Sequence, residues 1–294
     1  MNKFAIYTAV VGNYDEIRQP LVVDSRFDYF LFSNTIKEKQ IGVWQIKPIE
    51  YTNPDQVKIA RYVKTHPETL LPDYTATLWM DANIQIIDTW VYERFIELYQ
   101  NGSQIASVKH PGRDCIYEEI FAVCSFQYET LEVAHKWNHF LRLKNYPRHN
   151  GLFETNLMYR TNSKNIRIFD ECWWFYIENY SRRDQLSFNY ALWERKEVCH
   201  VFFMTSDSVK TSPHFEYIKH PNRSEQNKIV KNAHYLARLW DYYNEDNYKC
   251  KNKFINRWLL VLSLPLPLTK LFFYLWRQTI RVKKDVLRYL KING

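Results

Sequence analysis

Short apolar runs alternate along the chain with segments of helical periodicity. Six runs rich in β-branched and aromatic residues are typical of strands and lie at 4–11, 27–32, 43–49, 77–80, 104–109 and 198–204. Apolar positions recur at helical spacing in the intervening segments 54–65, 90–99, 115–143 and 163–180. This order predicts an α/β domain with a mostly parallel central sheet flanked by helices.

The run at 77–80 stops abruptly at a polar interruption. Asp81, Ala82 and Asn83 follow it, and the apolar pattern resumes at Ile84. In open α/β sheets, ligands gather at the carboxyl ends of strands. Oxygen ligands two residues apart in a turn can face one hard cation. An Asp-x-Asn at a strand end is, however, more often a plain turn or a helix cap, so the remaining polar clusters must decide.

Further polar clusters lie at predicted strand ends and helix starts. They are Gly12 to Asp15, His110 to Asp114, Glu154 with Asn156 at the mouth of one more short strand, and Asp184 with Gln185. In a mostly parallel sheet these clusters converge, together with Arg61 and Lys64 from a helix, on a site for a metal-bound diphosphate beside a polar acceptor. The alternative for the two cations is a solvated helix face.

Glycine and cysteine usage excludes several classes of protein. The six glycines form neither GxGxxG nor GxxxxGK[ST], which argues against a dinucleotide-binding Rossmann site and a P-loop. The five cysteines form no CxxC pair, which argues against a disulfide framework or a structural zinc site and favours a reducing compartment. Because the first residues show no signal-peptide pattern, we expect a cytoplasmic protein.

The net charge of +8 belongs to the C-terminal segment. Residues 250–294 contain ten of the 40 Lys and Arg residues but one of the 32 Asp and Glu residues, so the body offers no general support for nucleic-acid binding. On a helix, six cations of this segment share an arc of about 80°. They are Lys270, Arg277, Arg281, Lys284, Arg288 and Lys291.

Apolar residues occupy the opposite side of this predicted helix. The pattern predicts an amphipathic tail that lies on the anionic inner face of the cell membrane as a peripheral anchor. Its alternative is a helix packed on the body with solvated cations. We therefore expect a domain at 1–249 and a membrane-associating tail at 250–294.

Seven segments together resemble a known family. They are YTAVVGNYD (7–15), DYFLFSN (28–34), RYVKTHP (61–67), LWMDANI (78–84), KHPGRDCIYEE (109–119), GLFETNLMYR (151–160) and SRRDQLSFNY (181–190). The sequence is similar to the glycosyltransferase-like family of plant proteins linked to pollen-tube and mucilage polysaccharides and of bacterial proteins from surface-polysaccharide loci. It also looks distantly similar to glycogenin-like retaining transferases. The resemblance covers about residues 4–205.

The resemblance implies a GT-A-like fold and transfer of a hexose from a nucleotide sugar, with a UDP-sugar as the expected donor. Asp81 and Asn83 would take the place of the metal-binding DxD motif for Mn²⁺ or Mg²⁺, with His214 or His220 as a third ligand. Because Asn83 replaces a carboxylate, the resemblance implies weaker or dispensable metal binding.

The other roles also follow from the resemblance. The nucleoside would bind Thr8, Gly12, Asn13 and Tyr14, and the diphosphate would bind Arg61 and Lys64. Glu154, Asn156, Asp184 and Gln185 would surround the donor sugar. Retention would place Asp184 near the anomeric carbon, whereas inversion would make Asp184 or Glu119 the base; the sequence leaves this choice open.

The expected acceptor is a glycan, lipid-linked in our preferred interpretation. Two alternatives remain from the sequence. A nucleotidyltransferase would also use a metal-bound diphosphate, and a membrane-associated glycan-binding protein would use the strand-end acids for structure.

Overall fold

The computed structural model describes residues 2–12, 16–125, 128–204 and 208–218. These residues belong to one compact unit, and the predicted tail and its boundary at 249/250 lie outside them. No helix in the described ranges is long and apolar enough to cross a membrane.

A mostly parallel sheet of eight strands forms the centre of the fold, in the order β3-β4-β2-β1-β5-β8-β7-β9. Pairings β1–β2, β1–β5, β2–β4 and β7–β9 are parallel, whereas β8 is antiparallel to both neighbours and β3 to β4. The strands are β1 (Phe4–Val10), β2 (Phe27–Ser33), β3 (Gln40–Ile41), β4 (Trp44–Pro48), β5 (Ala76–Met80), β7 (Ile105–Lys109), β8 (Phe153–Thr161) and β9 (His200–Phe202). The carboxyl ends of β1, β5 and β7 consequently share one edge with the start of β8.

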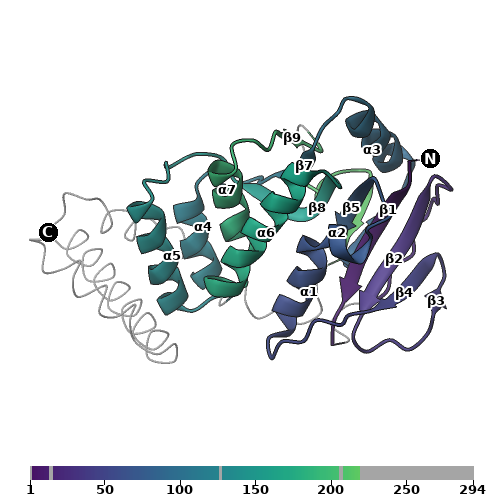
Figure 1. Ribbon diagram of the computed structural model, residues 1–294, viewed down its shortest axis with the longest axis horizontal. Coiled ribbons are helices and arrows are strands. Elements are labelled where there is room, and N and C mark those ends of the chain that lie inside the picture. The colour runs from purple at the N-terminus through teal and green to yellow at the C-terminus, as the bar shows by residue number, and fades with distance from the viewer. Residues whose placement is uncertain (1, 13–15, 126–127, 205–207, 219–294) are drawn as a thin grey trace, which may run out of the picture. The chain divides into compact units, whose positions relative to one another are not determined.

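Seven helices occur in the described residues: α1 (Gln56–Thr65), α2 (Pro67–Leu70), α3 (Trp90–Gln100), α4 (Ile116–Ser125), α5 (Leu131–Leu143), α6 (Lys164–Asn179) and α7 (Asp184–Glu194). A second, two-stranded sheet pairs β6 (Ile84–Ile86) with β10 (Phe215–Tyr217). Figure 1 shows α1 beside α6, and α7 beside α4 and α5.

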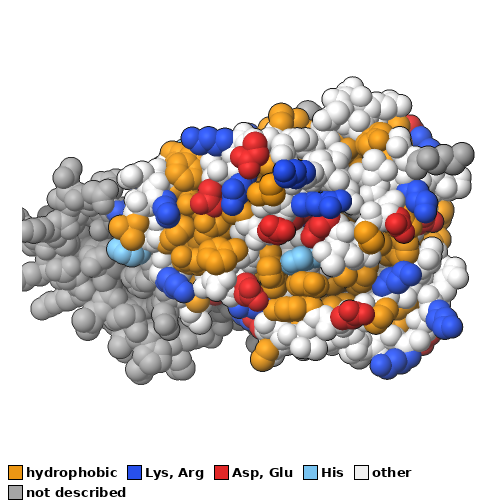
Figure 2. All heavy atoms as spheres, viewed as in Figure 1, with side chains coloured by type: hydrophobic (Ala, Val, Ile, Leu, Met, Phe, Trp, Pro, Cys, Tyr) orange, Lys and Arg blue, Asp and Glu red, His pale blue; other side chains and the backbone are white. Residues whose placement is uncertain are grey.

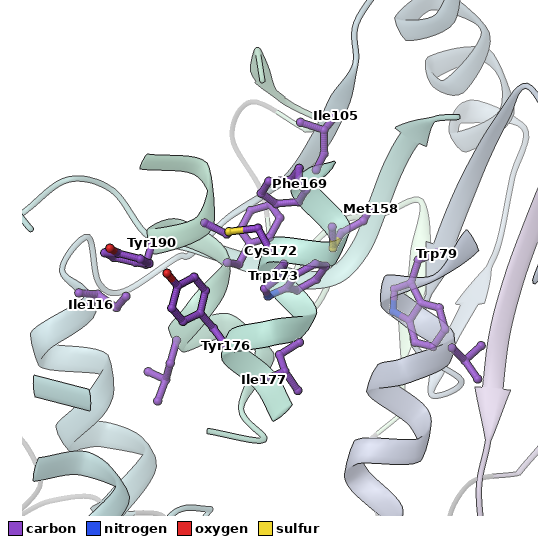
Figure 3. Close-up of a cluster of buried hydrophobic side chains, with 14 of the residues drawn as sticks. Trp79, Ile105, Ile116, Met158, Phe169, Cys172, Trp173, Tyr176, Ile177 and Tyr190 are labelled. Carbon is purple, nitrogen blue, oxygen red and sulfur yellow. The ribbon is translucent and has the colours of Figure 1, made fainter. Parts of the chain in front are cut away.

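Two hydrophobic cores cover the two faces of the sheet. Because side chains alternate along a strand, Ala5 and Tyr7 of β1 enter one core and Ile6 and Val10 the other. The first core contains the aromatic residues of α6 and α7, and Figure 3 shows Trp173 and Tyr176 there with Tyr190. The second contains the buried side of α3. A strand buried on both faces explains the unbroken apolar run at 4–11.

The structure confirms the predicted α/β fold with its mostly parallel sheet and flanking helices. Details at element ends differ. Helix α1 begins at Gln56, although the sequence suggested Asn53 and Pro54 as its cap and first turn; Asp55 caps it and accepts a hydrogen bond from the Val57 amide at 3.0 Å. Asn53 instead accepts a hydrogen bond from the Asp55 amide at 2.9 Å.

On the face of the molecule shown in Figure 2, acidic and basic side chains are interspersed.

Candidate active site

Lys64 comes from the last turn of α1, and its backbone is fixed from the sheet. The Lys64 carbonyl accepts a hydrogen bond from the Tyr7 hydroxyl at 2.9 Å and a second from the Arg160 guanidinium. Arg160 also donates to Tyr7 and forms a buried ion pair with Asp170 at 2.6 Å. These contacts hold the helix end against β1 and β8, so the lysine side chain starts from a rigid position.

The Lys64 ammonium lies between two carboxylates. Its Nζ is 2.5 Å from Asp184 Oδ2 and 3.6 Å from Asp81 Oδ1. Thr155 Oγ1 is 3.2 Å from the same nitrogen and donates to Asp184 Oδ2 at 2.8 Å. On the other side of Asp184, Arg61 Nε is 3.1 Å from Oδ1. Both oxygens of Asp184 therefore face protein groups, and its side chain is only 3% exposed.

Charges around Asp184 set its protonation. Burial alone would raise the pKa of Asp184, but Arg61, Lys64 and Arg183 together hold that pKa far below its usual range. Burial lowers the pKa of Lys64, and Asp184 and Asp81 oppose that shift. We interpret the pair as an ammonium and a carboxylate, because each is the nearest opposite charge of the other.

An irregularity in β8 turns its first residues toward this edge. Ser107 pairs with Met158, yet the next residue, Val108, pairs with Glu154, so the β8 residues between them have no partner on β7. Such irregularities redirect side chains. Glu154 accepts hydrogen bonds from Ser208 Oγ at 2.8 Å and from Lys210 Nζ at 2.9 Å.

A fourth acid, Glu119 of α4, completes the cluster. Arg113 Nε binds Glu119 Oε2 at 2.6 Å, and His110 Nε2 lies 4.0 Å from the same oxygen. Burial, with the charges of Arg113 and Lys210, lowers the pKa of His110 to about 4, so its ring is neutral near pH 7. Burial raises the pKa of Glu119, and the charge of Arg113 opposes that shift.

Some buried polar atoms at this cluster have no hydrogen-bond partner in the described part of the chain. Buried polar atoms normally have one, so each exception calls for an explanation. Three belong to residues of the cluster or directly beside it: Asn156 Oδ1, Arg183 Nε and Gln185 Nε2. A polar ligand with anionic and hydroxyl groups would satisfy donors and acceptors of this kind.

The predicted nucleoside segment is described as far as Gly12. Gly12 has φ +64°, and its amide binds Asn34 Oδ1 at 3.1 Å. A Cβ on this glycine would lie 3.4 Å from Gln56 Oε1, at the start of α1. Thr8 lines a small hollow with Met80 and Ala82, on the side of the sheet that faces the second core. Asn13 and Tyr14 lie outside the described residues.

The metal ligands expected from the resemblance do not converge in the described part of the chain. Asp81 Oδ1 accepts a hydrogen bond from Trp79 Nε1 at 2.8 Å and faces Lys64. The Asn83 side chain is buried and donates to the Ile218 carbonyl at 3.0 Å. Among the described residues, no three His, Cys, Asp or Glu side chains gather as a metal site would require.

His214 lies elsewhere. Its ring bonds Asp88 at 2.8 Å and stacks on Trp90 with centroids 4.5 Å apart. It flanks the opposite end of the β6–β10 pairing from Asn83. His220 is outside the described residues. The described donors therefore do not fit a divalent ion, and no step proposed below passes through one.

The structure brings Arg61, Lys64, Asp81, Glu119, Glu154, Asn156, Asp184 and Gln185 to one edge of the sheet. Sequence reasoning included Arg113 in a strand-end cluster without giving it a role, and it missed Thr155, Arg183 and Lys210. Three of these lie inside the motifs HPGRD, FETN and SRRDQ, which were signals for them. Lys210 had no such signal, since it enters through its contact with Glu154.

A mostly parallel α/β sheet with cations, carboxylates and amides at the carboxyl ends of its strands defines an α/β protein with a polar, ligand-binding type of site at that edge. Residues 1–215 match the family model of the TOD1/MUCI70 glycosyltransferase-like domain, and the chain belongs to this family. No curated protein matches the chain.

Proposed function

We propose that this protein transfers a hexose from a nucleotide sugar, with a UDP-sugar as donor, to a glycan. The observation that carries the proposal is the group of buried cations and unpartnered polar atoms at the strand ends of a chain that belongs to a glycosyltransferase-like family. Stabilising the departing nucleoside diphosphate is the main electrostatic task of such a reaction. Arg61, Lys64 and Arg183 supply the charge for it.

In this proposal the nucleoside binds near Gly12 and the sugar lies against Asn156, Gln185 and Glu154. Asp184 orients Lys64, because both of its oxygens are engaged by protein groups. Glu119 and Glu154 line the side on which the acceptor hydroxyl would enter. Retention or inversion of the anomeric carbon stays a prediction that only the product can decide.

We further propose that the acceptor is a lipid-linked surface polysaccharide or oligosaccharide. The basic segment at 250–294 would hold the enzyme on the anionic inner face of the cell membrane, beside such an acceptor. The Mn²⁺ or Mg²⁺ ion stays a prediction from the resemblance.

The test is a panel of nucleotide sugars with release of nucleoside diphosphate as the readout. We expect one UDP-sugar to yield UDP, and the intact sugar to appear on the acceptor. Transfer of a nucleoside monophosphate would instead identify a nucleotidyltransferase, and no reaction with any donor would favour a glycan-binding protein.

A matched pair of variants on α1 links that activity to the cluster. Arg61→Gln is expected to lower kcat/KM by about tenfold or more, since hydrogen bonds to charged groups are among the stronger ones. Lys58→Gln is the control, because Lys58 lies on the same helix and binds the Glu178 carbonyl away from the cluster. Equal effects of both substitutions on kcat/KM would contradict the assignment of Arg61 to the donor-binding site.

A further inference from the structure

We propose that this site binds the diphosphate of its donor through Arg61 and Arg183, with the buried positive charge of Lys64 beside them, and without a divalent metal ion. The inference rests on the proposed function, because it concerns how the donor is held. It departs from the metal-dependent mode that the resemblance implies.

The first argument is the chemistry of the donors at Asp81 and Asn83. A divalent ion of this kind is normally held by several oxygen ligands, at least one or two of them carboxylates. Asp81 supplies one carboxylate, and one of its oxygens already accepts the Trp79 indole N–H. Asn83 adds no charge, and its amide is turned to the Ile218 carbonyl. Other carboxylates of the cluster are bound to Lys64, Arg113 or Lys210.

The second argument is the position of Lys64. Its ammonium is buried and lies 3.6 Å from Asp81 Oδ1, an oxygen of the carboxylate expected to bind the metal ion. A divalent cation on Asp81 would lie beside this fixed positive charge, and the two would repel each other in a site that is poorly solvated. The Lys64 ammonium therefore supplies, next to Asp81, the positive charge that a metal ion would otherwise supply.

The third argument is the excess of cationic groups around Asp184. Arg61, Lys64 and Arg183 all act on this one carboxylate. The Nε atom of Arg183 is buried and has no hydrogen-bond partner in the described part of the chain. Arg61 pairs with Asp184 through its Nε at 3.1 Å, and 15% of its side chain is exposed. Guanidinium groups bind phosphate through paired N–H donors. A diphosphate would both satisfy these donors and balance the charge.

Binding of UDP measured by calorimetry, once in EDTA and once in Mn²⁺, tests the inference on the full chain. We expect dissociation constants within about threefold of each other in the two buffers, a difference of well under 1 kcal/mol. Arg61→Gln and Arg183→Gln should each weaken binding in EDTA by about tenfold, whereas the control Lys58→Gln should not. Thermal melts of each variant show that the chain is folded.

The substitution Asp81→Asn should change UDP binding in opposite directions with and without a metal ion at the site. Without a metal ion, loss of this negative charge near Lys64 should strengthen UDP binding by about twofold to fivefold. With a metal ion on Asp81, the same substitution should abolish binding. Titration of Mn²⁺ alone should give no heat of binding to the wild type.

Three results would overturn the inference in distinguishable ways. UDP binding that needs Mn²⁺ and is lost in Asp81→Asn would establish a metal site and leave the transferase proposal standing. Binding in EDTA that neither arginine substitution weakens would place the diphosphate elsewhere. No binding of UDP, GDP or CDP in either buffer would overturn the proposed function as well.

Discussion

Asp184 illustrates how burial decides the role of a single carboxylate. The sequence suggested a catalytic carboxylate near the anomeric carbon, yet its oxygens face Lys64, Thr155 and Arg61. A carboxylate with both oxygens bound and 3% of its side chain exposed has no open path to a substrate. We interpret it as the counter-ion that positions Lys64.

Asp184→Asn is therefore expected to reduce stability as well as activity. Removing one partner of a buried ion pair costs roughly 3–5 kcal/mol, because the other charge stays buried without compensation. Urea denaturation at pH 7 measures the effect, and Asp73→Asn, at an exposed position, is the control. A loss no larger than that of the control would contradict the ion pair.

The stability that Asp184 contributes to the fold changes with pH in a defined direction. The folded-state pKa of Asp184 is held below its usual value, so its contribution is fully present above about pH 4, the ordinary pKa of an aspartate. It is lost only as the pH falls further. Asp184→Asn should consequently remove stability equally at pH 6 and pH 8.

His200 predicts a second pH effect, at a higher pH. Burial lowers its pKa to about 4, and its Nε2 lies 2.7 Å from Ser107 Oγ. The neutral ring therefore stabilises the fold fully above about pH 6.5, and this contribution fades as the pH falls toward 4. Urea denaturation of wild type should show stability falling between these values.

His200→Gln should make that fall shallower, by about 1–3 kcal/mol at pH 4, since the ring is partly buried. The variant lacks the group that must become charged on acidification. A profile parallel to that of the wild type would show that His200 does not titrate in this range.

At the residue scale, motifs predicted Arg61, Lys64, Asp81 and Asp184 because charged residues beside apolar runs stand out in the sequence. Contacts between residues far apart in the chain could not be predicted. Thr155 reaches Asp184 only because β8 changes register at Glu154, and no local pattern encodes that change.

At the element scale, the position of α1 depends on hydrogen bonds to the carbonyl groups of its last turn. Tyr7 and Arg160 both donate to the Lys64 carbonyl, so the sheet fixes the helix end that carries the functional lysine. Orphan carbonyls at a helix end need such partners. The site thus rests on a contact between β1, β8 and α1 that involves no ligand.

Tyr7→Phe should weaken this contact without removing it. We expect a loss of about 1–3 kcal/mol in the free energy of unfolding, because the Tyr7 hydroxyl also accepts a hydrogen bond from the buried Arg160. UDP binding should weaken modestly, because Arg160 still binds the carbonyl. Tyr159→Phe is a matched control, since the buried Tyr159 hydroxyl has no partner among the described residues. Similar losses in both variants would mean that the Tyr7 hydrogen bond contributes nothing.

Periodicity was a good guide to elements and a poor one to their ends. Strands β1, β2 and β5 were predicted because double-sided burial leaves uninterrupted apolar runs. The short strands β3 and β10 were missed, since two or three residues carry no period. The strand predicted at Glu154 as short is nine residues long in the structure. Its length was underestimated because polar residues interrupt the apolar pattern at its irregular start.

For the whole molecule, the proposed location at the membrane depends on the basic segment at 250–294, which lies outside the described residues. Flotation with vesicles tests it on the full chain. We expect binding to vesicles that contain phosphatidylserine, weak binding to neutral phosphatidylcholine, and loss of binding at high salt.

A fourfold substitution to glutamine should release the protein, at about 1 kcal/mol per cation near an anionic surface. It replaces Arg277, Arg281, Lys284 and Arg288. Four exposed lysines of the body form the control: Lys3, Lys37, Lys39 and Lys196. Equal flotation of both variants would contradict a membrane role for the segment.

Helix α1 also fixes the distance between the proposed nucleoside and phosphate ends of the site. It begins with Gln56 beside Gly12 and ends near Lys64, eight residues later, which is about 12 Å along a helix axis. Because the helix is rigid, a ligand that contacts both ends must carry its nucleoside and its terminal phosphate at that separation. We therefore expect the protein to discriminate among donors by span, and to reject nucleoside monophosphate sugars whatever sugar they carry.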